Sequence, residues 1–194
     1  MSTIYLIRHG ESTANAGLKT GDTALTPLTE LGHQQAGEVP SKLPKRIDHI
    51  IVSSYLRTQQ TAEPTRLVHP AAPVWEWAEV REFTYLDPKK ANGTTLEERK
   101  PMVNAFWEAM NPEWQVSPEV ESFGQFIDRV KLVHSMLQEQ FSGREKHVAL
   151  FTHALFMKAF FQVVEKPTAS KLELMNTFFD CPLIYNCDIF TFDV

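Results

Sequence analysis

The sequence predicts an α/β fold in which helices cover both faces of a mostly parallel central sheet. Largely apolar runs of strand length stand at 4–7, 49–52 and 146–151, as expected for strands buried on both faces. Each run precedes a segment expected to form a helix, and strands that alternate with helices build parallel sheets. The expected architecture is a three-layer α/β/α sandwich.

The first strand, at 4–7, is expected to lead into a helix. Thr26 followed by Pro27 has the pattern of an N-cap with proline at the first helical position, so a helix is expected from there to about Val39. Pro40 is expected to end this helix, because proline lacks an N–H and clashes with the preceding turn.

The second strand, at 49–52, is closed by Ser53 and Ser54. Serine is a favoured N-cap residue, so a helix is expected over about 55–67. A third short strand is expected at 73–77.

The segment 83–122 is the least regular part of the chain, with four prolines and an Asn-Gly pair. It is expected to carry one helix at about 96–110 and to act as a lid or substrate wall. Apolar residues at spacings of three and four predict a helix over 123–141. The remaining expected elements are a helix at 154–164 and one or two strands within 183–192.

Composition and charge limit the kinds of partner. The length of 194 residues suits one domain, 1–194, and a net charge of −5 without a long Lys/Arg run argues against nucleic-acid binding. No apolar run approaches the ~20 residues of a membrane span, and residues 1–5 lack signal-peptide features, so a cytoplasmic protein without membrane association is expected. Cys181 and Cys187 lack metal-site spacing and are expected to be buried thiols. The oligomeric state stays open.

Charged side chains follow several of the expected strands. Arg8 and His9 come after the first strand, Arg57 stands in the first turn of the helix after the second, and His153 follows the strand that ends near 151. Because ligands bind at the carboxyl edge of an open parallel sheet, these side chains are expected to meet in one cleft. Two arginine forks and a helix N-terminus suit a phosphate group.

The chemistry expected at such a site is phosphoryl transfer. One of the two histidines, His9 and His153, would be the nucleophile and the other would stabilise the transferring group, and spacing alone does not decide which. A leaving oxygen also requires a proton. Glu82, which follows the third strand and is flanked by apolar groups that would raise its pKa, is the candidate for this acid, and Glu79 is a competitor on the residues alone.

Five motifs in order resemble the histidine phosphatase superfamily, which includes the phosphoglycerate mutases. The first is similar to that superfamily's R-H-G-x-[ST] signature. A three-residue R-H-G match is weak evidence, whereas five elements in the right order are specific. The motifs are RHGES at 8–12 with Asn15 beyond it, PLTELGHQQA at 27–36, SSYLRTQQTA at 53–62, VRE at 80–82 and THA at 152–154.

The resemblance implies a phosphoglycerate mutase-like fold and definite roles. His9 would attack phosphorus to form a phosphohistidine, and Glu82, in preference to Glu79, would protonate the leaving group and then assist water. No metal and no cofactor would be required. The groups implied to hold the phosphoryl oxygens are Arg8, Arg57 and His153, with Asn15 supporting the pocket.

Two departures from the family pattern stand out. Ala154 occupies a position where many members have glycine, and alanine would be strained if that position required a positive φ. Residues 83–87, FTYLD, replace the F-G-x-x-E-G run that commonly follows the acid. This second difference bears on the substrate and leaves the reaction unaffected.

The expected function is that of a metal-independent phosphatase, a phosphoric monoester hydrolase of the histidine acid phosphatase type, acting on a small phosphorylated metabolite. The alternatives are phosphoglycerate mutase-type transfer and a catalytically idle module that binds a phospho-ligand. Aromatic residues of the irregular segment either line the leaving-group site or pack as core. These residues are Phe83, Tyr85, Phe106, Trp107 and Trp114.

Overall fold

The computed structural model describes all 194 residues and contains one five-stranded sheet with the order β3-β2-β4-β1-β5. Strands β1 to β4 run parallel to their neighbours, and β5 pairs antiparallel with β1 at the edge. The α/β class with a mostly parallel sheet is confirmed. The strands are β1 (Thr3–Arg8), β2 (His49–Val52), β3 (Val74–Glu76), β4 (His147–Thr152) and β5 (Ile189–Asp193).

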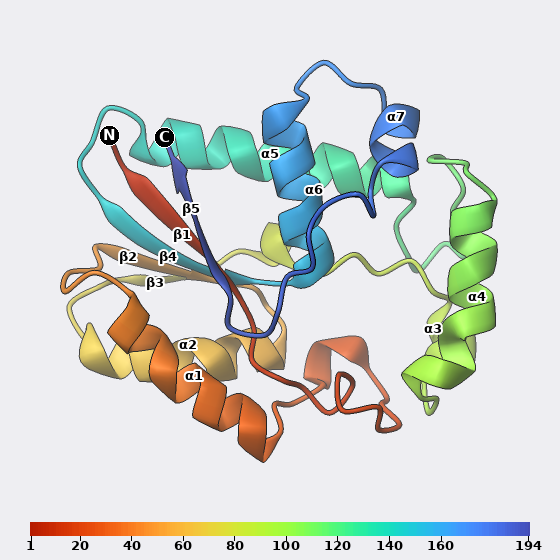
Figure 1. The fold of residues 1–194 in the computed structure, drawn as a ribbon, viewed down its shortest axis with the longest axis horizontal. Helices are drawn as coiled ribbons and strands as arrows, with labels where there is room; N and C mark the ends of the chain where they lie inside the picture. Colours follow the sequence, from red (N-terminus) through yellow and green to blue (C-terminus); the bar gives the residue numbers. More distant parts are fainter.

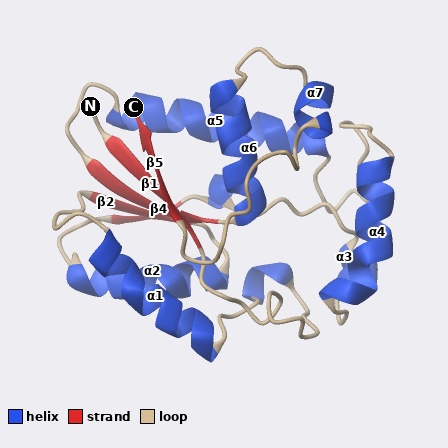
Figure 2. Ribbon diagram, viewed as in Figure 1, coloured by secondary structure: helices blue, strands red, loops and turns tan.

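Helices lie on both faces of the sheet, which gives the three expected layers (Figure 1, Figure 2). One face is covered by α1 (Glu30–Lys42) and α2 (Leu56–Val68), and the other by α5 (Phe123–Phe141) and α6 (Ala154–Glu165). Alternate side chains of each strand enter opposite layers. In β1, for example, Ile4 and Leu6 join a core cluster of 25 residues, whereas Ile7 joins a second cluster of 10.

The predicted start of the first helix is wrong. Helix α1 begins at Glu30, and the Thr29 hydroxyl caps it by accepting the N–H of Gly32 at 3.0 Å. Thr26 is extended, and Leu28 forms a bridge with Ser12, so this stretch lies against the loop after β1 instead of opening a helix.

Two further details of helix ends are corrected. Pro40 lies inside α1, which continues to Lys42, because proline near a C-terminus removes one N–H without ending the last turn. The expected serine N-cap of α2 is absent. Tyr55 occupies the cap position without a side-chain bond, while the Ser53 hydroxyl accepts the N–H of Tyr55 at 3.3 Å.

The other predicted elements are confirmed within a few residues, including α5 at its predicted bounds, and the 183–192 stretch contains one strand. Several short elements escaped prediction, since a turn or two of helix carries little periodic signal. They are the 3₁₀ turns η1 (Thr23–Leu25) and η2 (Ala78–Val80) and the helices α3 (Pro88–Ala91) and α7 (Lys171–Asn176). No helix has the length and apolar character needed to cross a membrane.

The irregular segment 83–122 packs on the body of the protein through aromatic side chains. It contains α4 (Leu96–Glu108), and Phe83, only 4% exposed, stacks on Phe126 of α5 with ring centroids 4.4 Å apart. Phe106 is 1% exposed and stacks with Trp114. The aromatic residues of this segment therefore act mainly as core, and they attach the segment firmly to α5.

Candidate active site

The two site histidines meet because β1 and β4 are neighbours. Arg8 pairs in register with Thr152, so His9 and His153 leave adjacent strands at the same carboxyl edge. The N–H of His9 donates to the Thr152 carbonyl at 3.0 Å. The two rings meet edge to face with centroids 5.2 Å apart. The predicted convergence of these side chains is thus present in the structure.

The His9 ring is held as a neutral imidazole. Its Nδ1 lies 2.7 Å from the carbonyl oxygen of Gly10, and its Nε2 lies 3.1 Å from Nε of Arg57. An Nδ1–H that donates to a carbonyl leaves Nε2 with a lone pair, which accepts from the arginine. Burial, together with the charges of Arg57 and Arg8, lowers the pKa of His9 well below its ordinary value. The site therefore presents an uncharged ring nitrogen that faces Arg57.

Two arginines flank this ring, and neither forms an ion pair with a carboxylate. Arg57 lies in the first turn of α2, is 5% exposed and donates from Nη1 to the Thr23 carbonyl at 2.7 Å. Arg8 donates from Nη1 to the Ile184 carbonyl at 2.7 Å, while its buried Nε has no partner. Burial lowers the pKa of both guanidinium groups. Two partly desolvated cations side by side favour an anion between them.

His153 adds another unpartnered donor. Its Nε2 lies 2.9 Å from the hydroxyl of Ser53, and its Nδ1 is buried without a partner. In the tautomer that carries the ring proton on Nδ1, Nε2 accepts from the Ser53 hydroxyl and the Nδ1–H is left free to donate. Burial lowers the pKa of His153 well below its ordinary value, and the charge of Arg57 is the second largest cause of this shift. A neutral N–H donor is thus available beside His9.

Glu82 lies at the N-terminus of α6. Its carboxylate accepts the N–H groups of Phe83 at 3.0 Å, Phe156 at 3.2 Å and Leu155 at 3.3 Å. Burial raises the pKa of Glu82, and these donors together with Arg57 and Arg8 oppose the increase. The side chain of Glu79 takes no part in these contacts. Of the two glutamates, only Glu82 contacts the start of α6 through its side chain.

The alanine that replaces the family glycine causes no backbone strain. Ala154 is the first residue of α6, and its neighbour His153 is the extended N-cap. The non-glycine residues with positive φ are Met110 and Cys187. The conditional expectation of strain at Ala154 therefore does not apply.

Asn15 is exposed and organises the loop behind His9. Its Oδ1 accepts from the N–H of Ser12 at 3.2 Å and from the Ser12 hydroxyl at 3.0 Å. Asn186, which the sequence did not single out, donates from Nδ2 to the His9 carbonyl at 2.9 Å and to Asn15 at 3.4 Å. It comes from the chain just before β5, where no local pattern marks it.

The same loop is pressed closely against α1. A Cβ on Gly32 would stand 2.0 Å from the Glu11 carbonyl oxygen, and a Cβ on Gly10 would stand 2.5 Å from the Gly32 carbonyl oxygen. Gln35 fixes the loop further by accepting the N–H of Glu11 at 2.8 Å. The glycines of the first two motifs thus allow backbone contact directly behind the nucleophile.

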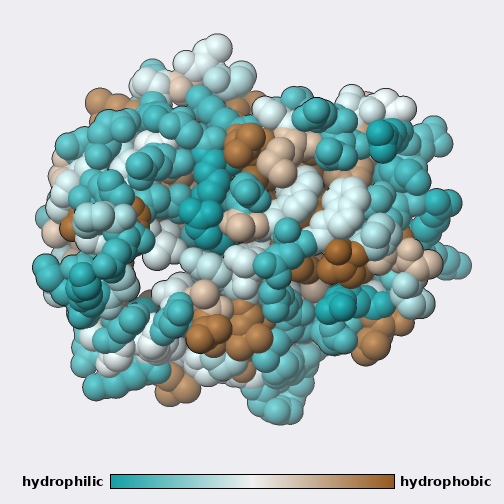
Figure 3. Space-filling model, turned by 180° about the vertical axis from the view of Figure 1, so that it is seen from behind, coloured by the Kyte–Doolittle hydropathy of each residue, from teal (hydrophilic) through white to brown (hydrophobic).

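A pocket of about 420 Å³ opens beside the site. Tyr55 and Glu82 form its inner end, and its walls come from the η1 loop, residues 83–86, α3 and the start of α4. From behind, the surface is visibly hollowed between the α3–α4 segment and the η1 loop (Figure 3). Open space therefore adjoins the Glu82 side chain. No group of three or more His, Cys, Asp or Glu side chains is arranged to hold a metal ion.

Comparisons with known proteins agree with this geometry. The model of the histidine phosphatase superfamily (branch 1) matches residues 4–180. A curated relative, the probable phosphoglycerate mutase GpmB of Yersinia pestis, is 34% identical over 128 residues, which is 62% of this chain and 58% of the relative. The match thus spans little more than half the relative's length.

Solved structures match nearly the whole chain. YhfR of Bacillus stearothermophilus has 25% identity and a TM-score of 0.79, covering 100% of this chain and 92% of its own. A putative alpha-ribazole-5'-P phosphatase of Escherichia coli has 24% identity and a TM-score of 0.74, covering 100% and 91%. These two proteins share the fold of this chain.

Proposed function

Because the chain belongs to the histidine phosphatase superfamily, branch 1, we propose that it hydrolyses phosphomonoesters through a phosphohistidine on His9. The observation that carries this proposal is the state of the His9 ring. Its Nδ1 bonds to the Gly10 carbonyl, and the lone pair of its Nε2 accepts the N–H of Arg57. A neutral nucleophile held between two cations suits attack on a phosphate dianion.

The first step transfers the phosphoryl group to the enzyme. Nε2 of His9 attacks phosphorus in line, and the P–O bond to the leaving group breaks. The proton of Glu82 passes to the departing oxygen, which leaves as an alcohol. The raised pKa of Glu82 favours the protonated form that this role requires.

The second step returns the enzyme to its starting state. The Glu82 carboxylate accepts a proton from water, whose oxygen attacks the phosphohistidine and breaks the P–N bond. Inorganic phosphate leaves, and His9 regains its lone pair. Through both steps the phosphoryl oxygens are held by donors that the structure leaves free, chiefly Nε of Arg8 and Nδ1 of His153.

Asn15 serves this site indirectly. It closes the loop behind His9 and does not itself present a donor to the phosphate, since the bonds in which its side chain takes part are accepted by Oδ1. We therefore propose that Asn15 supports the pocket and that Arg8, Arg57 and His153 bind the phosphate.

The adjoining pocket favours hydrolysis of a small phosphorylated metabolite over mutase chemistry. A phosphoglycerate carries a carboxylate in addition to the phosphate, so its binding requires further cationic side chains that are not already paired. Arg99 in the pocket wall already donates to Thr94 and Thr20, and Lys89 pairs with Glu119 at 3.0 Å. Asp22 and Glu119 add negative charge to the lining. The name of the GpmB relative supports the mutase alternative.

We also propose that residues 83–122 form a substrate wall within one domain and do not act as a mobile lid. The packing of Phe83 on Phe126 of α5, and of Phe106 on Phe83, supports a fixed wall. A cytoplasmic location is the accompanying proposal, and the free thiols of Cys181 and Cys187 support a reducing compartment.

The test is a screen of phosphomonoesters, including 3-phosphoglycerate, in the presence of a chelator. Free phosphate and isomerised phosphoglycerate are both measured. We expect phosphate release in the chelator and a fall of about 10⁴-fold or more in His9→Ala. Isomer formation without free phosphate would establish a mutase. Phosphate binding without turnover by both proteins would establish a phospho-ligand-binding module.

A further inference from the structure

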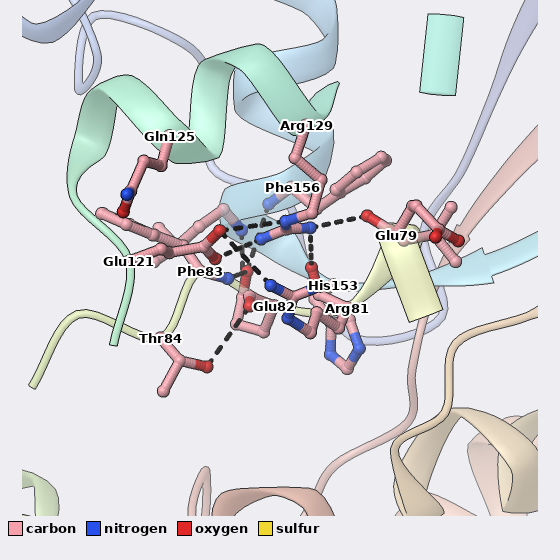
Figure 4. Close-up of polar contacts among 12 residues, drawn as sticks. Glu79, Arg81, Glu82, Phe83, Thr84, Glu121, Gln125, Arg129, His153 and Phe156 are labelled. Carbon is pink, nitrogen blue, oxygen red and sulfur yellow. Dashed lines mark hydrogen bonds and ion pairs between the residues drawn. The ribbon is translucent and has the colours of Figure 1, made fainter. Parts of the chain in front are cut away.

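A buried ion pair lies behind the acid, outside the contacts that the mechanism uses. Arg129 of α5 is 9% exposed, and its Nε donates to Glu121 at 3.0 Å while its Nη2 contacts the other oxygen of the same carboxylate. The guanidinium also stacks over the Phe126 ring at 5.1 Å. This geometry leaves Nη1 as the one nitrogen that points past the ion pair, toward the 79–82 segment (Figure 4).

Nη1 of Arg129 holds the backbone on which Glu82 stands. It donates to the carbonyl of Glu79 at 2.6 Å and to the carbonyl of Arg81 at 2.9 Å. The carbonyl between them, that of Val80, accepts from the hydroxyl of Thr152 at 2.6 Å. The three carbonyls immediately before Glu82 are therefore all held by side chains, and Thr152 ties the same turn to the strand end that carries His153.

We propose that Arg129, fixed by Glu121, is the positioning residue for the acid Glu82. The carboxylate of Glu82 reaches the α6 N–H groups at 3.2 and 3.3 Å, distances that a small shift of its backbone would lengthen beyond hydrogen bonding. Arg129 holds this backbone in place and so fixes the distance between the Glu82 carboxylate and the α6 N–H groups. This inference rests on the proposed role of Glu82 in the phosphatase reaction.

Stability alone explains the pair poorly. The free energy needed to desolvate a guanidinium and a carboxylate is about as large as the stabilisation from their attraction. Apolar side chains of similar volume would therefore stabilise the core at least as well. Arg129 instead donates two hydrogen bonds to main-chain carbonyls close to Glu82. Its charge is also one of those that disfavour protonation of His153.

The test compares two substrates that differ in their need for an acid. The p-nitrophenolate ion leaves without protonation, whereas an alkoxide does not, so loss of the acid lowers hydrolysis of an alkyl phosphate selectively. For Arg129→Met we expect kcat on an alkyl phosphate to fall by about 10²-fold, with kcat on p-nitrophenyl phosphate within about threefold of the wild type. Arg129→Lys should recover part of the loss, because an ammonium donates to one carbonyl.

The matched control is Arg66→Met, which removes an exposed arginine that pairs with Glu63, and it should leave both rates unchanged. An equal fall on both substrates in Arg129→Met would show a merely structural role and overturn the proposal. If that variant does not fold, Glu121→Gln decides by the same comparison, since it removes the negative charge and one of the two acceptor oxygens that fix Arg129. An unchanged ratio of the two rates in Glu121→Gln would then overturn it.

Glu82→Gln separates this inference from the function on which it rests. It should reproduce the selective loss on the alkyl phosphate, and adding Arg129→Met should lower the rate little further, because both changes act on one group. Without selectivity in Glu82→Gln, the acid role in the proposed function fails. With selectivity in Glu82→Gln but not in Arg129→Met, the positioning role alone fails.

Discussion

At the scale of single residues, two hydrogen bonds decide what His9 can do. The Gly10 carbonyl fixes the proton on Nδ1, and the Arg57 N–H faces the lone pair on Nε2. The neighbouring arginine charges and burial then disfavour a second proton. In the proposed mechanism a bound phosphate would replace the ring nitrogen as the partner of Arg57, which would release the lone pair of His9 next to the phosphorus atom.

The pH profile of kcat/KM follows from this environment. A histidine whose pKa lies well below 6.5 stays neutral as the pH falls through 6.5. Activity on p-nitrophenyl phosphate should therefore persist below pH 6.5, and its acid limb should report an apparent pKa under that value. Steady-state rates across the acid range measure this limb. An apparent pKa at or above 6.5 that His9 carries would contradict the assignment.

Some residues of the candidate site could be predicted from local sequence pattern, and others could not. Arg8, His9, Arg57 and His153 follow strands or open a helix, and parallel strands bring such positions to one edge, so their convergence could be predicted. The sequence also suggested Glu82, but without the family resemblance Glu79 stayed a competitor. Only the three-dimensional contacts at the start of α6 distinguish the two.

Asn186 and Arg129 could not be predicted in the same way. Each acts on a backbone carbonyl far away in sequence, that of His9 or those of Glu79 and Arg81. A side chain that bonds to a distant carbonyl leaves no periodicity and no spacing in its own segment. Such supporting groups become visible only once the fold is known.

At the scale of elements, the contact between α1 and the loop after β1 sets the position of the nucleophile. The predicted helix start at Thr26 was wrong because Thr26 is extended and Leu28 bridges to Ser12. The Pro-Leu-Thr stretch of the family motif therefore does not begin the helix. It places Thr29 at the N-cap and brings Gly32 against Glu11.

Two glycines in the same helix provide a test of this contact. Gly32→Ala would place a Cβ 2.0 Å from the Glu11 carbonyl oxygen, whereas a Cβ on Gly37 meets nothing within 4 Å. We expect Gly32→Ala to destabilise the protein by about 1–3 kcal/mol and to lower kcat/KM. Gly37→Ala should stabilise it by about 0.5–1 kcal/mol and leave kcat/KM unchanged.

Urea unfolding and steady-state kinetics measure both quantities for the two variants. The comparison controls for helix propensity, because both changes replace glycine by alanine within α1. Equal effects of the two substitutions on stability and activity would show that the close approach of α1 to the loop does not position His9.

At the scale of the whole molecule, the site is assembled from parts distant in sequence. The sheet delivers His9 and His153, α2 delivers Arg57, and the chain before β5 returns beneath them to bond with Arg8 through Ile184. The pocket beside this edge is walled by residues 83–122, whose aromatic side chains join the larger core cluster. The proposed substrate wall is therefore part of the core, and we expect it to select substrates by shape and charge.

The general architecture was predictable from apolar runs, because two-sided burial leaves a plain signature in parallel strands. The wall was predictable only as an irregular stretch with one helix. The sequence does not indicate whether the aromatic residues of the wall face a ligand or each other. In the structure Phe83 and Tyr85 do both: their rings stack with centroids 4.7 Å apart, and both line the pocket.

The central claim is that a covalent phosphohistidine forms on His9, and trapping it is the most direct test. The enzyme is mixed with a labelled phosphomonoester, quenched in alkali within the first turnover and digested for mass spectrometry. We expect an acid-labile, alkali-stable phosphoryl group on the peptide that contains His9, and no label in His9→Ala. Turnover without a labelled His9, or phosphate release by His9→Ala at the wild-type rate, would contradict the mechanism.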